Sequence, residues 1–537
     1  MKKIRRRILF SFFTATFFSI LFYYGTKCLF AILDKRAVEY SGAEIIILIP
    51  IILLATLLFY YLFGLRIKWK EDENFNLKRW QIFVPLIIAT TIVFLAFFPG
   101  HYVYDSSTMY KNFQAGEIST HFSPLITIVL SLLLSFGKML GTEAIGHAIF
   151  VAIQFIFIDI ILTNVIYYCS KKTNRKLFGI ISIIFFAINP LFQTILIRSG
   201  QDTLFGGFFT LLALEFLKIS EDENYFKEHK KLKFFYFFIL IFFICAIRNN
   251  GIFALIPVFI FSFFILKNSR ELRRKFYIAF IIPIITFLGY NYVFLYNFVV
   301  TEKESIYHET LNIPLIQIAR AMCFNRERNF ERELIPYFKA DTVEDYRMNW
   351  EVCSYYAGIS DTYKSRLDTE EVEKDPWKFF DLWRRIGEKN VANYIEAQFI
   401  FTLGLYHPYM PYEGGLQTFI RHTYIDGYTE SHDYFNTEKT NPFPITKNVV
   451  NYLVNSEGWS KIPILHLLWG GPFVFHLCIV SIVFSMYRKK YKYLLPLILI
   501  FGLIITVALS PVMLYRYIFP AVMCLPIMLY IFKSVLK

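Results

Sequence analysis

The chain has 537 residues, of which 56% are hydrophobic, 19% are aromatic and only 18% are charged. Soluble domains are about half apolar and about a quarter charged, so this composition excludes both a soluble enzyme and a disordered chain. The net charge of +14 does not indicate a nucleic-acid partner, because the basic residues gather in short loops between apolar runs. That pattern is typical of multi-pass proteins in the plasma membrane. We therefore expect an all-α polytopic protein surrounded by membrane lipids.

Apolar runs of about 20 residues, the length that crosses the hydrocarbon core, predict about twelve transmembrane helices. The basic start MKKIRRR resembles a signal peptide, but no small-residue cleavage site follows, so we expect a retained first helix. The predicted spans are 8–32, 44–64, 80–98, 143–168, 177–196, 203–218, 234–247, 250–266, 275–298, 463–487, 492–509 and 513–534. They divide the chain into two N-terminal helices with a basic loop (1–79), a membrane core (80–298) with an external loop (99–142), an external domain (299–461) and C-terminal membrane helices (462–537).

One further apolar run, residues 122–140, could be read as another span, and charge decides between the alternatives. If it does not span, MKKIRRR and the basic loops at 66–79, 171–176, 218–233 and 267–275 all face the cytoplasm. The positive-inside rule expects that arrangement. If the run did span, every later basic loop would face outward. We therefore predict an interfacial helix along the outer surface, with both termini in the cytoplasm.

Residues 299–461 differ in composition from the rest, because charged residues are frequent and no run is long enough to span. A segment of this length is too long for a passive loop, so we expect a large external, mainly helical domain. Within it, Asp375 begins a predicted amphipathic helix that continues through Ile386. Cys323 and Cys353 also fall in this segment, and the sequence favours unpaired thiols over a disulfide between them.

Polar residues that are costly near a membrane gather on the predicted outer side, in five separate segments. They are Asp105 in the first external loop, Arg198 and Asp202 in IRSGQD, Arg248 and Asn249 in CAIRNNG, His308 and Gln317 after the ninth span, and Arg516 in YRYIFP. Taken singly, each has a structural explanation. The two aspartates could cap helices, the arginines could be snorkelling anchors, and the histidine could settle a loop. Taken together, the set favours a functional site.

Carboxylates and arginines at one face suit a particular chemistry. Arginine binds phosphate with a bidentate fork and keeps its charge under all conditions. A nearby carboxylate can accept a proton from an incoming hydroxyl. The combination fits glycosyl transfer from a lipid-phosphate donor, with the carboxylate as base and the arginines stabilising the departing phosphate.

At these residues the sequence resembles the GT-C superfamily of polytopic glycosyltransferases, which use polyprenyl-phosphate-linked sugars. The resemblance rests on Asp105 in the first large external loop, on the His121-Phe122-Ser123-Pro124 start of the interfacial helix, and on the segments IRSGQD, CAIRNNGIFALIP and YRYIFP. More narrowly, NIPLIQIAR and YIEAQFIFTLGLYHP are similar to a bacterial family of uncharacterised membrane proteins related to these transferases. The similarity covers about residues 80–530.

The resemblance implies a GT-C-like helical core and an inverting hexosyl- or pentosyltransferase. The donor would be a polyprenyl-phosphate-linked sugar, and the acceptor a glycan, lipid or protein of the cell envelope, reached from the extracytoplasmic face. Asp105 would be the catalytic base or would orient the acceptor. The residues expected to bind the lipid phosphate and substrate are Arg198, Asp202, Arg248, Asn249, His308, Gln317 and Arg516.

The first external loop departs from the pattern of that superfamily. Many members carry an acidic pair there, whereas Asp105 is followed by Ser106 and Ser107. No metal ligand is therefore assigned, and Mg²⁺ or Mn²⁺ stays an open alternative. Two other classes of function also stay open: a transporter or flippase of a lipid-linked saccharide, and a non-catalytic membrane scaffold.

Overall fold

The computed structural model describes residues 2–33, 38–67, 72, 75–119, 121–227, 230–248, 251–301, 305, 307, 310–325, 330–338, 364, 366–408, 442–455, 462–510 and 513–537. Across these ranges the protein is helical, and its extended pairings are two isolated bridges, His101 with Arg198 and Phe338 with Leu367. The predicted all-α class is confirmed for this part of the chain. Asn249, His308 and Cys353 lie outside it.

Seven helices of the described residues are long and apolar enough to cross a membrane, and two bent helix pairs raise the number to nine. A multi-pass architecture therefore follows from length and composition. The seven are α1 (Lys2–Leu33), α2 (Ala43–Gly64), α3 (Arg79–Ala96), α6 (Glu143–Thr173), α9 (Gln201–Glu221), α12 (Arg270–Leu288) with its continuation through η1 (Gly289–Leu295) and α13 (Tyr296–Phe298), and η6 (Tyr491–Tyr493) with α28 (Leu494–Ala508).

The two bent pairs are α7 (Lys176–Ile188) with α8 (Pro190–Leu196), bent by 70°, and α29 (Tyr515–Met523) with α30 (Leu525–Leu536), bent by 50°. The first break has a clear local cause. Pro190 has no N–H to continue the helix. The Asn189 side chain starts a new one, because its Oδ1 accepts from the Leu191 and Phe192 backbone N–H groups.

The remaining apolar helices are shorter or carry charge. α5 (Pro124–Met139), α11 (Gly251–Ile265) and α27 (Gly471–Tyr487) have 10–17 residues, and α10 (Lys230–Ile247) begins with three lysines in four residues. Seven to nine is therefore the range that helix length and composition support by themselves. Short elements that complete the membrane-side part are α4 (Tyr104–Gln114), α25 (Pro444–Val450), η5 (Asn451–Asn455) and α26 (Pro463–Trp469).

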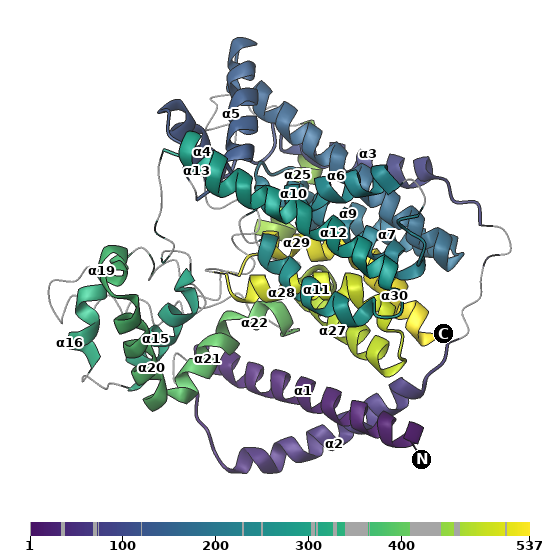
Figure 1. Cartoon of the computed structure of the whole chain (residues 1–537), viewed down its shortest axis with the longest axis vertical. Helices are drawn as coiled ribbons and strands as arrows, with labels where there is room; N and C mark the ends of the chain where they lie inside the picture. The colour runs from purple at the N-terminus through teal and green to yellow at the C-terminus, as the bar shows by residue number, and fades with distance from the viewer. Residues whose placement is uncertain are drawn as a thin grey trace.

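The charged segment folds as a lobe with its own core at the end of the molecule opposite to both termini (Figure 1). Its helices are α15 (Asn312–Asn325), α16 (Glu331–Leu334), η3 (Ile335–Tyr337), α19 (Thr369–Lys374) and α20 (Pro376–Lys389). Asp375 caps α20 by accepting from the Lys378 N–H at 3.1 Å, and Phe379, Leu382 and Ile386 face the core. The predicted amphipathic helix is thus confirmed.

Helices α21 (Val391–Phe401) and α22 (Leu403–Tyr406) join the lobe to the membrane-side helices. Arg320 of α15 pairs with Glu396 of α21 at 3.0 Å, and each side chain is only 2% exposed. Two residues further on, Gln398 Nε2 donates to the Ala508 carbonyl at the end of α28. Phe399 also packs near Tyr24 of α1, with ring centroids 6.3 Å apart. The lobe is therefore anchored to the membrane-side helices through α21, by a buried ion pair, a hydrogen bond and an aromatic contact.

Helices α5 and α6 form a tight hairpin near α4 and α13 (Figure 1). Their approach depends on two glycines: a Cβ on Gly146 would lie 2.0 Å from the Leu133 carbonyl oxygen, and one on Gly137 would lie 2.2 Å from the Gly146 nitrogen. The apolar face of α5 that does not pack on α6 is exposed at Val129, Leu132 and Phe136. An exposed apolar face of this kind suits contact with lipid.

Candidate functional site

Four of the residues predicted from the sequence meet in a chain of alternating charges, which we call the ion chain. Arg516 Nη1 donates to Asp105 Oδ2 at 2.7 Å, and Arg516 Nε lies 3.5 Å from Asp202 Oδ2. Arg248 Nη1 donates to the other oxygen of Asp202, also at 2.7 Å. The ion chain therefore reads Asp105–Arg516–Asp202–Arg248 and joins α4, α29, α9 and the end of α10.

Both carboxylates stand in the first turn of a helix but neither caps it. Helix α4 starts at Tyr104 with Val103 as its N-cap, and α9 starts at Gln201 with Gly200 as its N-cap. Neither residue can cap through its side chain, because valine has no side-chain acceptor and glycine has no side chain. A negative charge near a helix N-terminus is still favourable, because it is attracted by the partial positive charge at that end of the helix dipole. The helix-cap explanation for the two aspartates does not apply, and their side chains turn to arginines instead.

Backbone contacts between two loops bring Asp105 and Asp202 together. The His101 N–H donates to the Ile197 carbonyl at 2.8 Å, and the Ser199 N–H donates back to the His101 carbonyl at 3.0 Å. Gly100, with φ of +100°, allows this approach, because a Cβ there would lie 2.8 Å from the Ile197 carbonyl oxygen. The loop before α4 is thus fixed to the turn before α9.

The start of α5 closes the same region from another side. The Ser123 N–H donates to Gln201 Oε1 at 3.1 Å, and the Ser123 hydroxyl donates to the Ala246 carbonyl at 2.8 Å. Gln201 is next to Asp202, and Ala246 lies two residues before Arg248. The start of α5 therefore contacts the ends of α9 and α10 that carry the ion chain.

Arg198 is close in the chain to Asp202, but its side chain has a different environment from those of the ion chain. Its side chain is buried, and its carbonyl accepts from Gln154 Nε2 of α6 at 2.8 Å. Burial, with the positive charge of Arg198 as the next cause, lowers the pKa of His101 to about 3. Arg198 is not one of the four residues of the ion chain; it lies next to His101, with which it forms an isolated backbone bridge.

The ion chain is not uniformly accessible. The Asp105 side chain is 27% exposed, whereas those of Arg516, Asp202 and Arg248 are each 12% exposed. The Asp105 end is therefore the more open to an approaching ligand. A carboxylate at an open end, backed by two arginines in a drier setting, combines a proton acceptor with anion-binding groups.

Tyr517 belongs to the same cluster and was not among the predicted site residues. The Arg248 guanidinium lies 4.2 Å from its ring centroid, and that of Arg516 lies 5.2 Å away. Stacking of this kind fixes guanidinium planes. The signal was available in the sequence, because Tyr517 directly follows Arg516 in YRYIFP.

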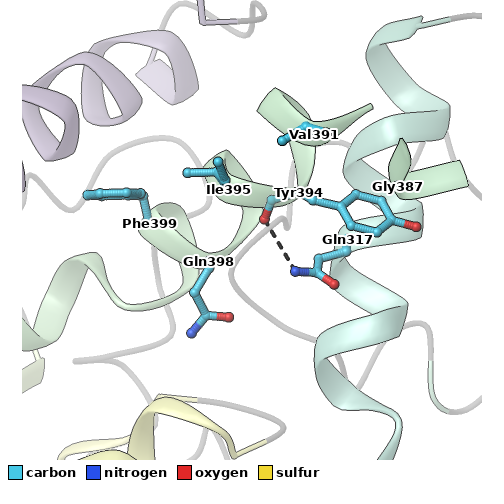
Figure 2. Close-up of a pocket in the computed structure, with 7 residues that line it drawn as sticks. All are labelled: Gln317, Gly387, Val391, Tyr394, Ile395, Gln398 and Phe399. Carbon is cyan, nitrogen blue, oxygen red and sulfur yellow. Dashed lines mark hydrogen bonds between the residues drawn. The ribbon is translucent and has the colours of Figure 1, made fainter. Parts of the chain in front are cut away.

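Gln317 lies on α15 in the lobe and is not one of the four residues of the ion chain. Its Oε1 accepts from Trp383 Nε1 at 2.9 Å, and its Nε2 reaches the Tyr394 carbonyl at 3.4 Å. Figure 2 shows it lining a cavity of about 390 Å³ together with Val391, Ile395, Gln398 and Phe399.

Asn249 and His308 lie outside the described residues. Within those residues, no three His, Cys, Asp or Glu side chains come together as a metal site.

Asp159 is a second polar residue that sequence reasoning missed. It lies in the middle of α6 and is 1% exposed, with Thr90 of α3 as a polar neighbour. A carboxyl group at that depth is expensive and is a functional candidate by default. The signal in the sequence was a single aspartate inside an otherwise apolar run.

The profile of a family of unknown function (DUF6020) matches residues 117–535 of the chain. The match includes Asp202, Arg248 and Arg516, and it begins after Asp105. No curated protein and no solved structure matches the chain.

Proposed function

We propose that this chain, which belongs to the DUF6020 family of unknown function, is a membrane glycosyltransferase that uses a polyprenyl-phosphate-linked sugar. The observation that carries the proposal is the ion chain. Two carboxylates and two arginines from four separate segments meet at one end of the helical bundle, with Asp105 at the more open end. That set supplies a proton acceptor and a phosphate-binding pair within one site.

The proposed reaction is a single in-line displacement. The acceptor hydroxyl oxygen attacks the anomeric carbon while its proton passes to the Asp105 carboxylate. The bond between the anomeric carbon and the phosphate oxygen breaks, and the electron pair leaves with the lipid phosphate. Arg516 and Arg248 stabilise the charge on that phosphate, since guanidinium groups are strong donors to it. The configuration at the sugar is inverted.

The proposed topology has twelve crossings, cytoplasmic termini and the ion chain at the extracytoplasmic face of the plasma membrane. Basic segments gather near both termini, because Arg6 Nη2 donates to the Met486 carbonyl and Lys533 Nζ donates to the Thr173 carbonyl. This arrangement supports the proposed orientation. α5 would then lie along the outer surface and guide the lipid tail toward Asp105. A GT-C-like helical core is part of the same proposal. The acceptor class in this scheme is a cell-envelope glycan, lipid or protein.

The test is Asp105→Asn in the full chain, reconstituted in vesicles with polyprenyl-phosphate donors that carry a radiolabelled hexose or pentose. Loss of the base should reduce transfer by about a hundredfold or more. Glu143→Gln is the matched control, because Glu143 also pairs with neighbours near α4, accepting from Tyr110 and contacting Lys138 at 3.5 Å. The control should transfer at the wild-type rate. Equal transfer by Asp105→Asn and the wild type would rule out the assigned base.

A transporter or flippase of a lipid-linked saccharide is the second candidate, and the observation that favours it is Asp159. Transporters place charged groups near the bilayer midplane, where the substrate or a coupling ion binds. In that case Asp159→Asn should stop movement of a fluorescent lipid-linked saccharide between leaflets, and Asp105→Asn should leave it unchanged. The glycosyltransferase proposal expects no such movement from the wild type.

A further inference from the structure

A second cavity, with more polar lining than the one at Gln317, lies toward the far end of α9 from the ion chain. It has a volume of about 510 Å³ and lies where α6 and α9 end and α10 begins. Glu215, the first residue of α9 that lines it, follows Asp202 by 13 residues, which is roughly 20 Å at 1.5 Å of rise per residue. The ion-chain chemistry therefore does not involve this cavity. Its volume falls in the range of small-ligand sites.

Two buried carboxylates form the inner wall of the cavity, and tyrosine hydroxyls stabilise both of them. Glu215 accepts from Tyr225, and Glu221 accepts from both Tyr168 and Tyr530. The side chains of the two glutamates are only 5% and 9% exposed. Since phenol donors satisfy each carboxylate, neither one depends on a lysine alone for its hydrogen bonds.

Three lysines form the outer wall and are better exposed. Lys218 lies 2.6 Å from Glu215 and is 33% exposed, and Lys172 lies 3.0 Å from Glu221 and is 45% exposed. Both ammonium groups stand over the Tyr168 ring, at 5.7 and 5.6 Å. Lys233 donates to the Tyr225 carbonyl. Asp222 also lines the cavity, and its carboxylate accepts from the Asn224 N–H at 2.9 Å. The lining therefore holds three ammonium groups and three carboxylates.

We propose that this cavity binds a phosphate group, carried either by a membrane-lipid headgroup or by a soluble phosphate ester. Lysine ammonium groups are compact donors that turn readily toward a phosphate oxygen. The tyrosines keep the two glutamates hydrogen-bonded when the lysines turn. Basic pockets between helices at one membrane face are a common way to hold anionic headgroups. The cavity has room for the headgroup, and the tails of a lipid would remain in the bilayer.

The test compares thermal stabilisation of the full-length chain in detergent by three probes: phosphatidylglycerol, phosphatidylcholine and glycerol 3-phosphate. Lys172→Gln with Lys218→Gln should weaken the response to the effective phosphate probe by about fivefold for each lysine removed. Lys171→Gln with Lys231→Gln is the matched control, because these lysines neighbour the cavity in α6 and α10 without lining it. The control pair should keep the wild-type affinity.

Stabilisation by phosphatidylglycerol alone assigns the cavity to a lipid headgroup, and stabilisation by glycerol 3-phosphate assigns it to a soluble ester. Either result supports phosphate recognition. The proposal is overturned if no phosphate probe stabilises the wild type, or if the control pair weakens binding as much as the cavity pair. Lys233→Gln gives an independent variant that leaves the glutamate–lysine pairs intact. If the double variant does not fold, Lys233→Gln takes its place in the test, and it should weaken binding of the phosphate probe.

Discussion

Arg516 is the residue on which the ion chain depends, because its guanidinium is shared by two carboxylates. Its Nη1 contacts Asp105 and its Nε faces Asp202. A planar fork can serve both carboxylates at once, whereas an ammonium group is a point charge that reaches one of them. Arg516→Lys should therefore lower the transfer rate about tenfold or more and destabilise the fold by about 1–3 kcal/mol. The measurements are transfer kinetics and denaturation by SDS.

An exposed arginine gives the control for that variant. Arg384 pairs with Asp381 and is 56% exposed in the lobe, so Arg384→Lys should leave both measurements unchanged, since exposed pairs contribute little. Wild-type kinetics in Arg516→Lys would show that the shared fork is not needed.

His101 predicts a pH dependence of stability. Burial and the charge of Arg198 lower its pKa to about 3, and His147 and Lys447 also face it. The unfolded chain binds a proton at His101 below about pH 6.5, while the folded chain stays neutral there down to about pH 3. Stability is thus lost as the pH falls, by about 1 kcal/mol from pH 6.5 to 5.5. The slope of SDS-denaturation stability against pH should be smaller in His101→Gln, and identical slopes would contradict the assignment.

At the scale of elements, the α5–α6 hairpin is held by a backbone contact that leaves no room for a side chain. Gly146→Ala would put a Cβ against the Leu133 carbonyl and push the two helices apart. We expect a loss of about 1–3 kcal/mol in stability. Transfer should also fall, because the start of α5 contacts the ends of α9 and α10 through Ser123.

Gly289→Ala is the comparison for the hairpin variant. Nothing lies within 4 Å of a Cβ at Gly289, so this substitution should be neutral or slightly stabilising. If both alanine variants behave alike in SDS denaturation, the close approach of α5 and α6 is not what limits stability.

Helix positions followed from apolar runs, but helix breaks did not. The predicted single span at 177–196 is bent by 70° between α7 and α8, and the predicted last span is bent by 50° between α29 and α30. Hydropathy does not detect such bends, since the segments on both sides are mostly apolar. The local signals were Asn189-Pro190 and Leu525-Pro526, each a proline at the start of a new helix.

At the scale of the whole molecule, the Arg320–Glu396 pair attaches the lobe to the helical bundle. Both side chains are 2% exposed, so removing one partner leaves the other as an uncompensated buried charge. Arg320→Met should cost about 3–5 kcal/mol and expose the lobe to limited proteolysis. Arg320→Met with Glu396→Leu should recover much of that stability, and a double variant as protease-sensitive as the single one would argue against the pair as the attachment.

The sequence predicted which residues of the candidate site share one face, but it did not predict which of them form ion pairs with one another. Sidedness came from counting basic loops, which placed Asp105, Asp202, Arg248 and Arg516 at one end. Arg516 and Asp105 are 411 residues apart in the chain, and Arg248 and Asp202 are 46 apart, so no local pattern encodes their pairing. Gln317 shows that the predicted side does not determine the partners of a residue. It shares the predicted side, yet its hydrogen bonds are to Trp383 of α20 and Tyr394 of α21.

Helices α9 and α10 each have one end at the ion chain and the other at the lysine-lined cavity. α9 begins with Asp202 in its first turn and ends at Glu221, while α10 carries Lys233 near its start and leads into Arg248. An α-helix transmits an axial shift along its length, since its backbone hydrogen bonds resist compression. Occupancy of the cavity that displaced either helix would therefore alter the spacing of the charges at the opposite end of both helices. The cavity and the ion chain are mechanically connected through this pair.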